Sequence, residues 1–287
     1  MMTTTLRPAG PLQETGDGAR SRPYEVRVNS RVVGTVELAA DTPFGPSVGV
    51  IRGLWIDRPD RRRGRGTVAA LAAEEVLRGW GCRRIQVAVP AEAVEALRMA
   101  TALGYTEAGR NMAKKIAARP PALPRGAVGR PMTAGEYDAW LARAVAAYAR
   151  TWAERGLPAA AAEAKSRADH AQNLPRGLET PGTTFTVLEH GGQPVGHVWT
   201  AAGPALPRGD SALPGGVTSY VFDVEVAEEH RGRGHGRTLM LLAERAAAGA
   251  RSRLLGLQVF ADNAPALGLY RSLGYRTVQF TLGKPLI

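Results

Sequence analysis

The sequence predicts a mixed α/β fold that occurs twice in one chain, and three observations predict it. Strand-like and helix-like segments alternate along the second half, which is typical of a mixed twisted sheet flanked by helices on both faces. Motifs of the first half recur in the second half at a constant offset. A Pro/Gly-rich segment, residues 119–129, separates the copies. We therefore expect two related domains, residues 1–118 and 130–287.

The repeat is visible in short motifs. The second copy of each motif begins 170 positions after the first; the matching pairs are Arg61–Gly66 with Arg231–Gly236, Leu103–Tyr105 with Leu273–Tyr275, and Lys114 with Lys284. Upstream, Val33-Gly34 matches Val195-Gly196 at an offset of 162, so the second copy has eight extra residues in between. We assign them to the Gly/Pro-rich segment 203–216. Arg7-Pro8 and Arg130-Pro131 mark equivalent starts.

The two copies differ most after these starts. Pro8 and Gly34 are 26 positions apart, whereas Pro131 and Gly196 are 65 apart, so the first copy lacks about 39 residues, enough for two helices. In the second copy, Thr133 to Glu136 forms a capping box that opens a helix ending near Gly156. Pro158 opens a second, Ala-rich helix towards residue 172.

The remaining elements of the second copy follow in order. Alternating residues predict a hairpin of strands 183–189 and 194–200, then a strand over 217–226 rich in Val, Phe and Tyr. Leu239, Leu242, Ala243 and Ala246 mark the buried stripe of a helix. A strand over 254–260 and a helix from Asn263 to Gly274 come next. A last strand covers 275–282.

Composition and charge exclude several classes of protein. The 287 residues contain one cysteine, Cys82, which rules out an internal disulfide framework, and we expect no bound metal. No apolar run is long enough to cross a bilayer and the start does not resemble a signal peptide, so we expect a cytoplasmic protein without membrane contact. The net charge of +11 comes without a basic stripe, which argues against nucleic acid. A monomer or a homodimer is expected.

A glycine-rich loop between strand and helix carries the chemistry. Glycines let the backbone approach a ligand, and successive amides in such a turn bind anions. The helix that begins near Gly236 adds partial positive charge at its N-terminus. A diphosphate fits this place. The residues we expect to bind it are Arg231, Gly232, Arg233, Gly234, His235, Gly236 and Arg237.

This pattern of residues resembles a known family. Arg-x-x-Gly-x-Gly at 231–236, followed by Asn263, Tyr270 and Leu273-Gly274-Tyr275, is similar to the signature of the GNAT superfamily of coenzyme A-dependent N-acetyltransferases. The resemblance covers nearly the whole second copy. It implies two strands that splay into a V, with the pantetheine arm of acetyl-CoA, as cosubstrate, held by the backbone of Val224 and Val226.

The resemblance also implies catalytic roles. Tyr270 matches the family's general acid, and Asn263 is expected to hydrogen-bond the cosubstrate, to cap the following helix, or both. For the base we turn to the strand, where alternation places Val221, Asp223 and Glu225 on one face. Neighbouring carboxylates push one pKa upward, so Glu225 or Asp223 is the expected base, through a water. The alternative is a pair that binds a cationic amine or an arginine.

Two histidines and the first copy complete the prediction. His197 and His170 are further base candidates, for which a structural role is the alternative. In the first copy the positions of Asp223, Glu225, Asn263 and Tyr270 are occupied by Gly53, Trp55, Ala93 and Ala100. The first copy is therefore expected to be degenerate; it either still holds coenzyme A or is structural.

The sequence thus predicts an N-acetyltransferase whose second domain moves an acetyl group from acetyl-CoA to a primary amine of a small molecule or peptide, by direct transfer in a ternary complex. The sequence does not name the acceptor. The alternative is a non-catalytic, coenzyme A-responsive binding or scaffold protein.

Overall fold

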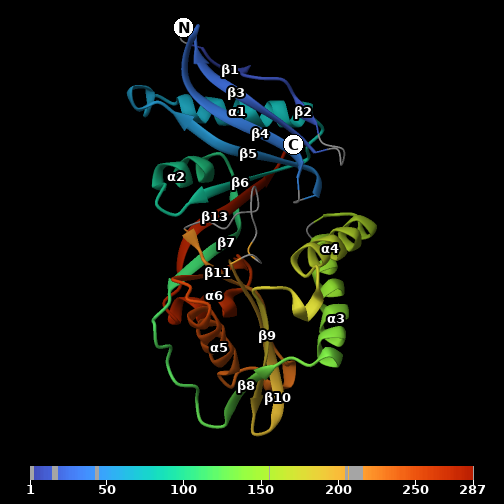
Figure 1. The fold of residues 1–287 in the computed structure, drawn as a ribbon. Coiled ribbons are helices and arrows are strands. Elements are labelled where there is room, and N and C mark those ends of the chain that lie inside the picture. Colours follow the sequence, from blue (N-terminus) through green and yellow to red (C-terminus); the bar gives the residue numbers. More distant parts are fainter. Residues whose placement is uncertain are drawn as a thin grey trace. The chain divides into compact units, whose positions relative to one another are not determined.

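The computed structural model describes residues 3–14, 19–42, 45–154, 156–203, 206 and 216–286. Most of the segment 203–216, to which we assigned the extra residues, lies outside them. The chain forms two compact units, Met1–Ala108 with Phe280–Ile287, and Gly109–Gln279 (Figure 1). No helix in the described ranges is both long and apolar enough to cross a membrane.

The first unit is a sheet with helices. Its elements are β1 Thr4–Pro8, β2 Gln13–Glu14, β3 Arg20–Val28, β4 Arg31–Thr42, β5 Gly45–Ile56, η1 Arg58–Asp60, α1 Arg65–Gly79, β6 Arg84–Pro90 and α2 Val94–Ala102. The strand order is β1-β3-β4-β5-β6, with β2 on β3. Only β5 and β6 pair in parallel among these neighbours. The described residues between β1 and β3 contain no helix, as expected for this copy.

The second unit has the same plan with additional helices. Its elements are β7 Thr106–Lys115, which begins in the first unit, β8 Ala127–Pro131, α3 Ala134–Glu154, α4 Ala159–Asn173, η2 Gly177–Glu179, β9 Thr183–His190, β10 Gln193–Ala202, β11 Ser219–Val226, η6 Glu228–His230, α5 His235–Gly249, β12 Leu254–Phe260, α6 Ala264–Ser272 and β13 Arg276–Pro285, which ends in the first unit. The order β7-β12-β11-β10-β9-β8 makes a mixed sheet and confirms the predicted fold class.

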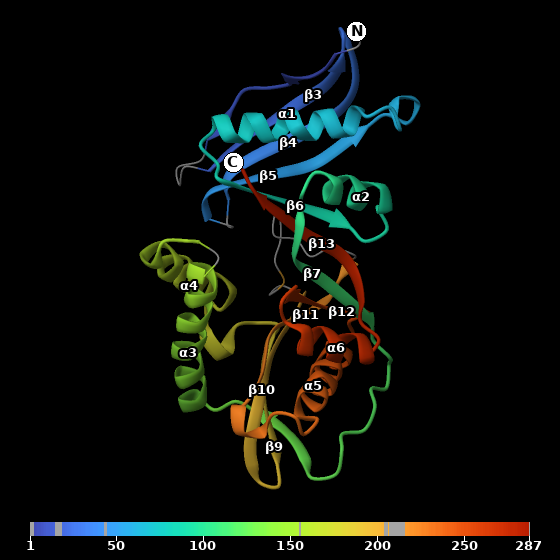
Figure 2. The same ribbon diagram turned by 180° about the vertical axis from the view of Figure 1, so that it is seen from behind.

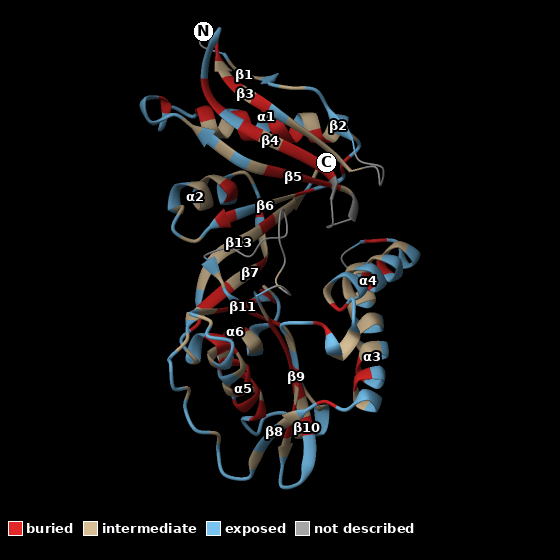
Figure 3. Ribbon diagram, in the orientation of Figure 1, coloured by how far each residue is buried: buried red, intermediate tan, exposed pale blue. Residues whose placement is uncertain are grey.

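Helices cover both faces of this second sheet. Leu188, Val198 and Leu239 belong to one core, which lies under α5 and α6. Phe185, Trp199 and Trp140 belong to a separate core under α3. Residues of β9 and β10 alternate between the two cores because successive strand residues point to opposite faces. The reverse view and the burial colouring show this layering around α5 and α3 (Figures 2 and 3).

The units differ in extent from the expected domains because the copies exchange their last strands. Strand β7 ends the first copy, yet its residues 109–115 pair antiparallel with β12 of the second, from Gly109↔Phe260 to Lys115↔Leu254. The end of β13 lies in the first unit, where the Leu286 amide donates to the Arg83 carbonyl at 2.8 Å. The boundary at residue 118 therefore separates the copies in sequence but not in space.

A lysine anchors each exchanged strand. In the first unit, Lys284 Nζ lies 2.8 Å from Glu74 Oε2 and donates to the Leu103 carbonyl. In the second unit, Lys114 Nζ lies 2.6 Å from Glu244 Oε1. Both glutamates are buried. The lysines that mark the repeat in the sequence are thus the partners of buried carboxylates in the opposite copy.

Candidate active site

Strands β11 and β12 pair only at their beginnings. Three parallel partners are formed, Ser219↔Leu255, Tyr220↔Gly256 and Val221↔Leu257. The rest of β11, residues 223–226, pairs with β10, and none of its described residues pairs with β12. This is the splay that the resemblance implies, and it leaves one edge of the backbone around Val224 and Val226 without a strand partner. Strands β5 and β6 of the first unit also pair only near their starts.

The glycine-rich loop at the end of β11 has the backbone conformation that the sequence predicts. Gly232 has φ +76° and Gly234, the N-cap residue of α5, has φ +84°. No heavy atom lies within 4 Å of a Cβ built on either glycine, so the space beside the loop is open. In the first unit Arg62 (φ +57°) and Gly64 (φ +74°) take the same conformations.

The three loop arginines have different surroundings. Arg231 Nε donates to the Val226 carbonyl at 3.2 Å. Arg237 Nη2 donates to Ser272 Oγ at 2.7 Å, which ties α5 to α6. Arg233 is exposed. Contacts within the protein therefore hold Arg231 and Arg237, two of the arginines predicted to bind phosphate, in position.

The face assignment of β11 needs one correction. The register passes from Trp199↔Asp223 to Thr200↔Val221, so Phe222 is an extra residue, a β-bulge. Val221 therefore packs in the core under α5, as Val224 and Val226 do, and does not share a face with Asp223 and Glu225. A bulge shifts by one residue the alternation of side chains between the two faces of the strand. The residue types of this segment alone do not predict where the bulge lies.

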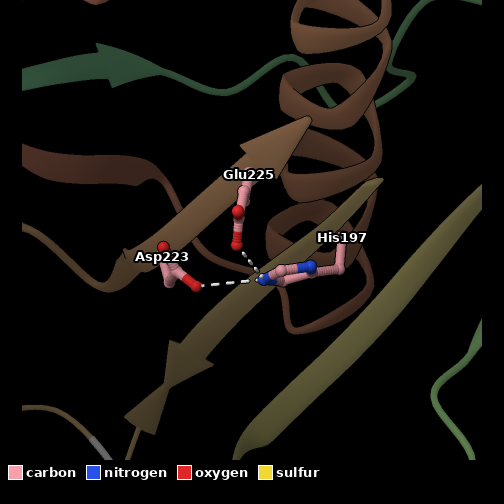
Figure 4. Close-up of side chains that lie close together, drawn as sticks. All are labelled: His197, Asp223 and Glu225. Carbon is pink, nitrogen blue, oxygen red and sulfur yellow. Dashed lines mark hydrogen bonds and ion pairs between the residues drawn. The ribbon is translucent and has the colours of Figure 1, made fainter. Parts of the chain in front are cut away.

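Asp223 and Glu225 meet His197 of β10 (Figure 4). They lie on the face of the sheet that Trp140 of α3 contacts. His197 Nε2 lies 3.1 Å from Asp223 Oδ2 and 3.8 Å from Glu225 Oε2. The His197 side chain is 10% exposed, that of Asp223 35% and that of Glu225 51%. The three ligand atoms lie within 4.8 Å of one another, a spacing that could also hold a metal ion. The structure thus brings three of the predicted candidates together.

Trp140 of α3 is a further contributor to the site, one to which the sequence analysis assigned no role there. Its Nε1 donates to Asp223 Oδ2 at 2.9 Å. Burial alone would raise the pKa of Asp223, but the hydrogen bonds and charge of His197, with the Trp140 and Val224 donors, hold that pKa below its usual value. Asp223 is therefore not the carboxyl whose pKa the pair was expected to raise. Its preferred state is the anion.

Tyr270 is buried on α6, where its ring lies 5.9 Å from that of Tyr275. Burial, with the negative charge of Asp223, raises the pKa of Tyr270 to about 12. Asn263 Oδ1 accepts a hydrogen bond from the Ala266 amide at 3.1 Å, so the structure shows its capping role. His170 is apart from the carboxylates: its Nδ1 contacts the Ser166 carbonyl at 2.8 Å, and its ring packs on Trp140 and Trp199.

The equivalent place in the first unit has different chemistry. Trp55 is 54% exposed and stacks under the Arg61 guanidinium, 4.1 Å from the ring centre. Gly53 occupies a left-handed conformation, φ +55°. Ala100 is buried in the place of Tyr270. No carboxylate or phenol is retained at these aligned positions.

A splayed strand pair that ends in a glycine-rich loop, beside a phenol and a carboxylate cluster, is the arrangement that the resemblance to the acyltransferases implies. The chain matches the family model described as "Acetyltransferase (GNAT) family" over residues 5–105 and 142–275. It belongs to this family, and both copies are GNAT domains.

Curated relatives agree with this assignment. An uncharacterized N-acetyltransferase of Bacillus subtilis, YycN, is 29% identical over 159 residues, which cover 54% of this chain and 96% of that protein. A mycothiol acetyltransferase of Pseudarthrobacter chlorophenolicus is 34% identical over 155 residues, which cover 54% of this chain and 44% of that enzyme.

Solved structures share the fold. A GCN5-related N-acetyltransferase from Sphaerobacter thermophilus has a TM-score of 0.59 at 18% identity, covering 92% of this chain and 80% of that one. A tandem GNAT protein from the clavulanic acid biosynthesis pathway has a TM-score of 0.53 at 20% identity, covering 96% and 85%. The predicted tandem GNAT architecture is confirmed.

Proposed function

We propose that the second copy transfers an acetyl group from acetyl-CoA to a primary amine of a small molecule or peptide. One observation carries the proposal, and it concerns strand β11 of the second unit. The glycine-rich loop follows the end of this strand, and the strand itself bears Asp223 and Glu225. A thioester carrier bound along this strand would bring its acetyl group towards groups that bind and deprotonate an amine.

The residues present fit such a carrier. The space beside Gly232 and Gly234 is open, and any residue other than glycine would place its side chain there. The amides around the N-terminus of α5 face a position that suits a diphosphate. The unpaired edge at Val224 and Val226 offers backbone hydrogen bonds to a pantetheine arm. The carrier supplies an activated acetyl thioester; the chain supplies the orientation and the proton transfers. Asn263 stays a proposed contact, because its visible partner is the helix.

The carboxylates have different proposed roles. Asp223, which Trp140 and His197 hold in its anionic form, positions His197 and attracts a cationic amine. Glu225 is more exposed and is not held by Trp140, so we assign it as the base that accepts the amine proton through a water. His197 bridges the two carboxylates.

Tyr270 is the proposed acid. Because its pKa is raised to about 12, its hydroxyl keeps the proton throughout the neutral range. It can therefore donate a hydrogen bond to negative charge that develops on a leaving sulfur.

The cluster favours a cationic acceptor. Two carboxylates beside a histidine attract an ammonium group and then accept its proton. The relative named as a mycothiol acetyltransferase supports a small-molecule acceptor, although it aligns over only 44% of its length. The helices α3 and α4 would border such an acceptor, because α3 supplies Trp140 to the cluster.

A matched pair of glycine variants tests the proposal. Gly234→Asp places a carboxylate in the loop of the second unit, and Gly64→Asp does so at the equivalent place in the first; both glycines have positive φ and open surroundings, so the backbone strain is alike. We expect Gly234→Asp to abolish thiol release from acetyl-CoA across a panel of amines, and Gly64→Asp to leave it intact. Full turnover in Gly234→Asp would refute the loop assignment. Carrier binding without thiol release for any amine would instead support the non-catalytic alternative.

A further inference from the structure

A cavity of about 240 Å³ adjoins the glycine-rich loop on the side of the β9–β10 hairpin. The side chains around it are basic or neutral: His190, Gln193, Val195, His230, Arg233 and His235. Three of the five histidines of the chain meet here. The ring of His235 lies 5.1 Å from that of His190 and 6.2 Å from that of His230. None of the described residues that line the cavity carries a carboxylate.

His235 is the buried member of this group. It is 7% exposed, and its ring contacts the rings of His190 and His230. Its own burial, and then the charges of His190, His230 and Arg233, lower its pKa. The guanidinium of Arg233 in the lining gives the cavity a positive charge, which favours an anion.

In the first copy, a carboxylate occupies the position that corresponds to this cavity. Asp60 aligns with His230, Arg65 with His235 and Arg31 with Gln193, at the offsets of the repeat. Asp60 is 2% exposed. Its carboxylate accepts two hydrogen bonds from Arg31, at 2.7 and 2.8 Å, and pairs with Arg65. The first copy therefore holds an anion of its own between two cations.

In the second copy this carboxylate is missing and the cavity is open. His230 replaces the anion, while His235 and Arg233 remain as donors around the space. Imidazoles can also bind a transition metal, but the guanidinium of Arg233 in the lining repels a cation. The buried carboxylate between two arginines in the first copy and the open cavity in the second point to the same ligand chemistry, an oxyanion.

We propose that this cavity, called here the histidine pocket, binds a phosphomonoester, and that the ligand is the 3′-phosphate of the coenzyme A carrier. The identification of the carrier rests on the proposed function. The ribose that bears the diphosphate on its 5′ carbon bears the phosphomonoester on its 3′ carbon. Arg233 and His235 belong both to the diphosphate loop and to the pocket lining. A phosphomonoester carries close to two negative charges at neutral pH, which matches a pocket that lacks a carboxylate.

The test compares acetyl-CoA with acetyl-dephospho-CoA, which differ only in this phosphate, by calorimetric titration of the full chain. We expect acetyl-dephospho-CoA to bind about tenfold more weakly or worse, the effect of losing charge-assisted hydrogen bonds. His230→Asp restores the carboxylate of the first copy and should bring the ratio of the two affinities close to one. His230→Asn, which adds no charge, should keep most of the ratio.

A second variant allows for a folding defect in His230→Asp, and a titration with inorganic phosphate tests whether the pocket binds free anions. Gln193→Glu places a carboxylate at the pocket from the exposed hairpin and should lower the ratio even if His230→Asp is unstable. Equal affinity of the wild-type protein for both carriers overturns the inference and leaves the proposed function standing. Failure of both carriers to bind overturns the proposed function itself. Binding of inorganic phosphate that His230→Asp removes, together with equal carrier affinities, would show a free-anion site and also overturn the assignment to the carrier.

Discussion

Trp140 reaches Asp223 from a position 83 residues earlier in the chain, and its indole N–H helps to fix that carboxyl as an anion. Asp223 and Glu225 are two residues apart on one strand, yet only Asp223 receives this donor. The two carboxyls differ in their hydrogen-bond donors because α3 places Trp140 next to Asp223. We base two predictions at the residue scale on this contact and on Tyr270.

Trp140→Phe keeps an aromatic ring in the core but removes the hydrogen bond to Asp223. Because this donor lowers the pKa of Asp223, its loss should raise that pKa towards its usual value. The acidic limb of the pH dependence of kcat/KM should therefore move to higher pH. Trp199→Phe is the matched control, since the Trp199 Nε1 is buried without a hydrogen-bond partner among the described residues. Equal profiles in both variants would contradict a positioning role for Trp140.

Tyr270→Phe removes the proposed acid with little change in packing. Turnover should fall by about a hundredfold or more, the usual size of a general-acid contribution. The affinity for acetyl-CoA should not change, because the hydroxyl acts on the leaving sulfur. In the wild-type protein, an alkaline limb well below pH 12 should belong to another group, since the pKa of Tyr270 is about 12. Unchanged turnover would remove Tyr270 from the mechanism.

At the scale of elements, the start of α3 shows how a local signal is reinforced by the fold. Thr133 and Glu136 form the capping box that the sequence predicts: the Thr133 amide donates to Glu136 Oε2 at 2.9 Å, and Thr133 Oγ1 accepts from the Glu136 amide at 3.3 Å. Arg130 on β8 adds a bidentate pair to Glu136 at 2.7 and 2.8 Å. The cap thus joins the helix to the sheet.

Glu136→Gln keeps an oxygen that can accept from Thr133 but removes the charge that pairs with Arg130, and it should destabilise the protein by about 1 kcal/mol at neutral pH, the upper end for a partly exposed ion pair. Hydrogen bonds from Arg130, then from Thr133, lower the pKa of Glu136 to about 2. A lowered carboxyl pKa gives a stabilisation that is complete above the ordinary value of 4.5 and is lost as the pH falls towards 2. The difference between wild type and Glu136→Gln in urea unfolding should shrink below pH 4.5. Glu154→Gln, at the far end of α3, should show no such trend.

At the scale of the whole molecule, the exchange of last strands means that neither copy is complete without the other. The end of β13 supplies Phe280 and Leu282 to the core of the first unit, and Leu286, just after the strand, packs against the same core. Lys284 supplies the cation for the buried Glu74. Removing one partner of a buried ion pair typically costs about 3–5 kcal/mol. The sequence boundary between the copies is therefore a poor place to cut the chain.

A fragment of residues 1–118 should associate or remain partly unfolded, because its β6 edge and Glu74 lack the exchanged strand. Adding a peptide of residues 276–287 should restore a soluble one-to-one complex, and the same peptide with Lys284→Met should restore it less well. Size-exclusion chromatography and amide NMR spectra would measure both. A fragment that is monomeric and unfolds cooperatively by itself would show that the exchange is dispensable.

Much of the second copy followed from local signals. The spacing of glycines and arginines at 231–236, the capping box at Thr133 and the breakers at Gly156 and Pro158 predicted the loop and the helix ends, because these features depend on backbone preferences of a few neighbouring residues. The family also follows from residues that are close in sequence. Strict alternation failed at Phe222, since a bulge depends on the register with β10.

The sequence by itself determined the repeat, the mixed α/β class and the loop that prefers anions. Only the tertiary structure decided which strand completes which unit, which carboxyl Trp140 fixes, and that His230 opens a pocket where Asp60 closes one. These are properties of contacts between residues that are distant in the chain. Such contacts form only when strands and helices pack, and the charge, burial and partners of a side chain follow from that packing.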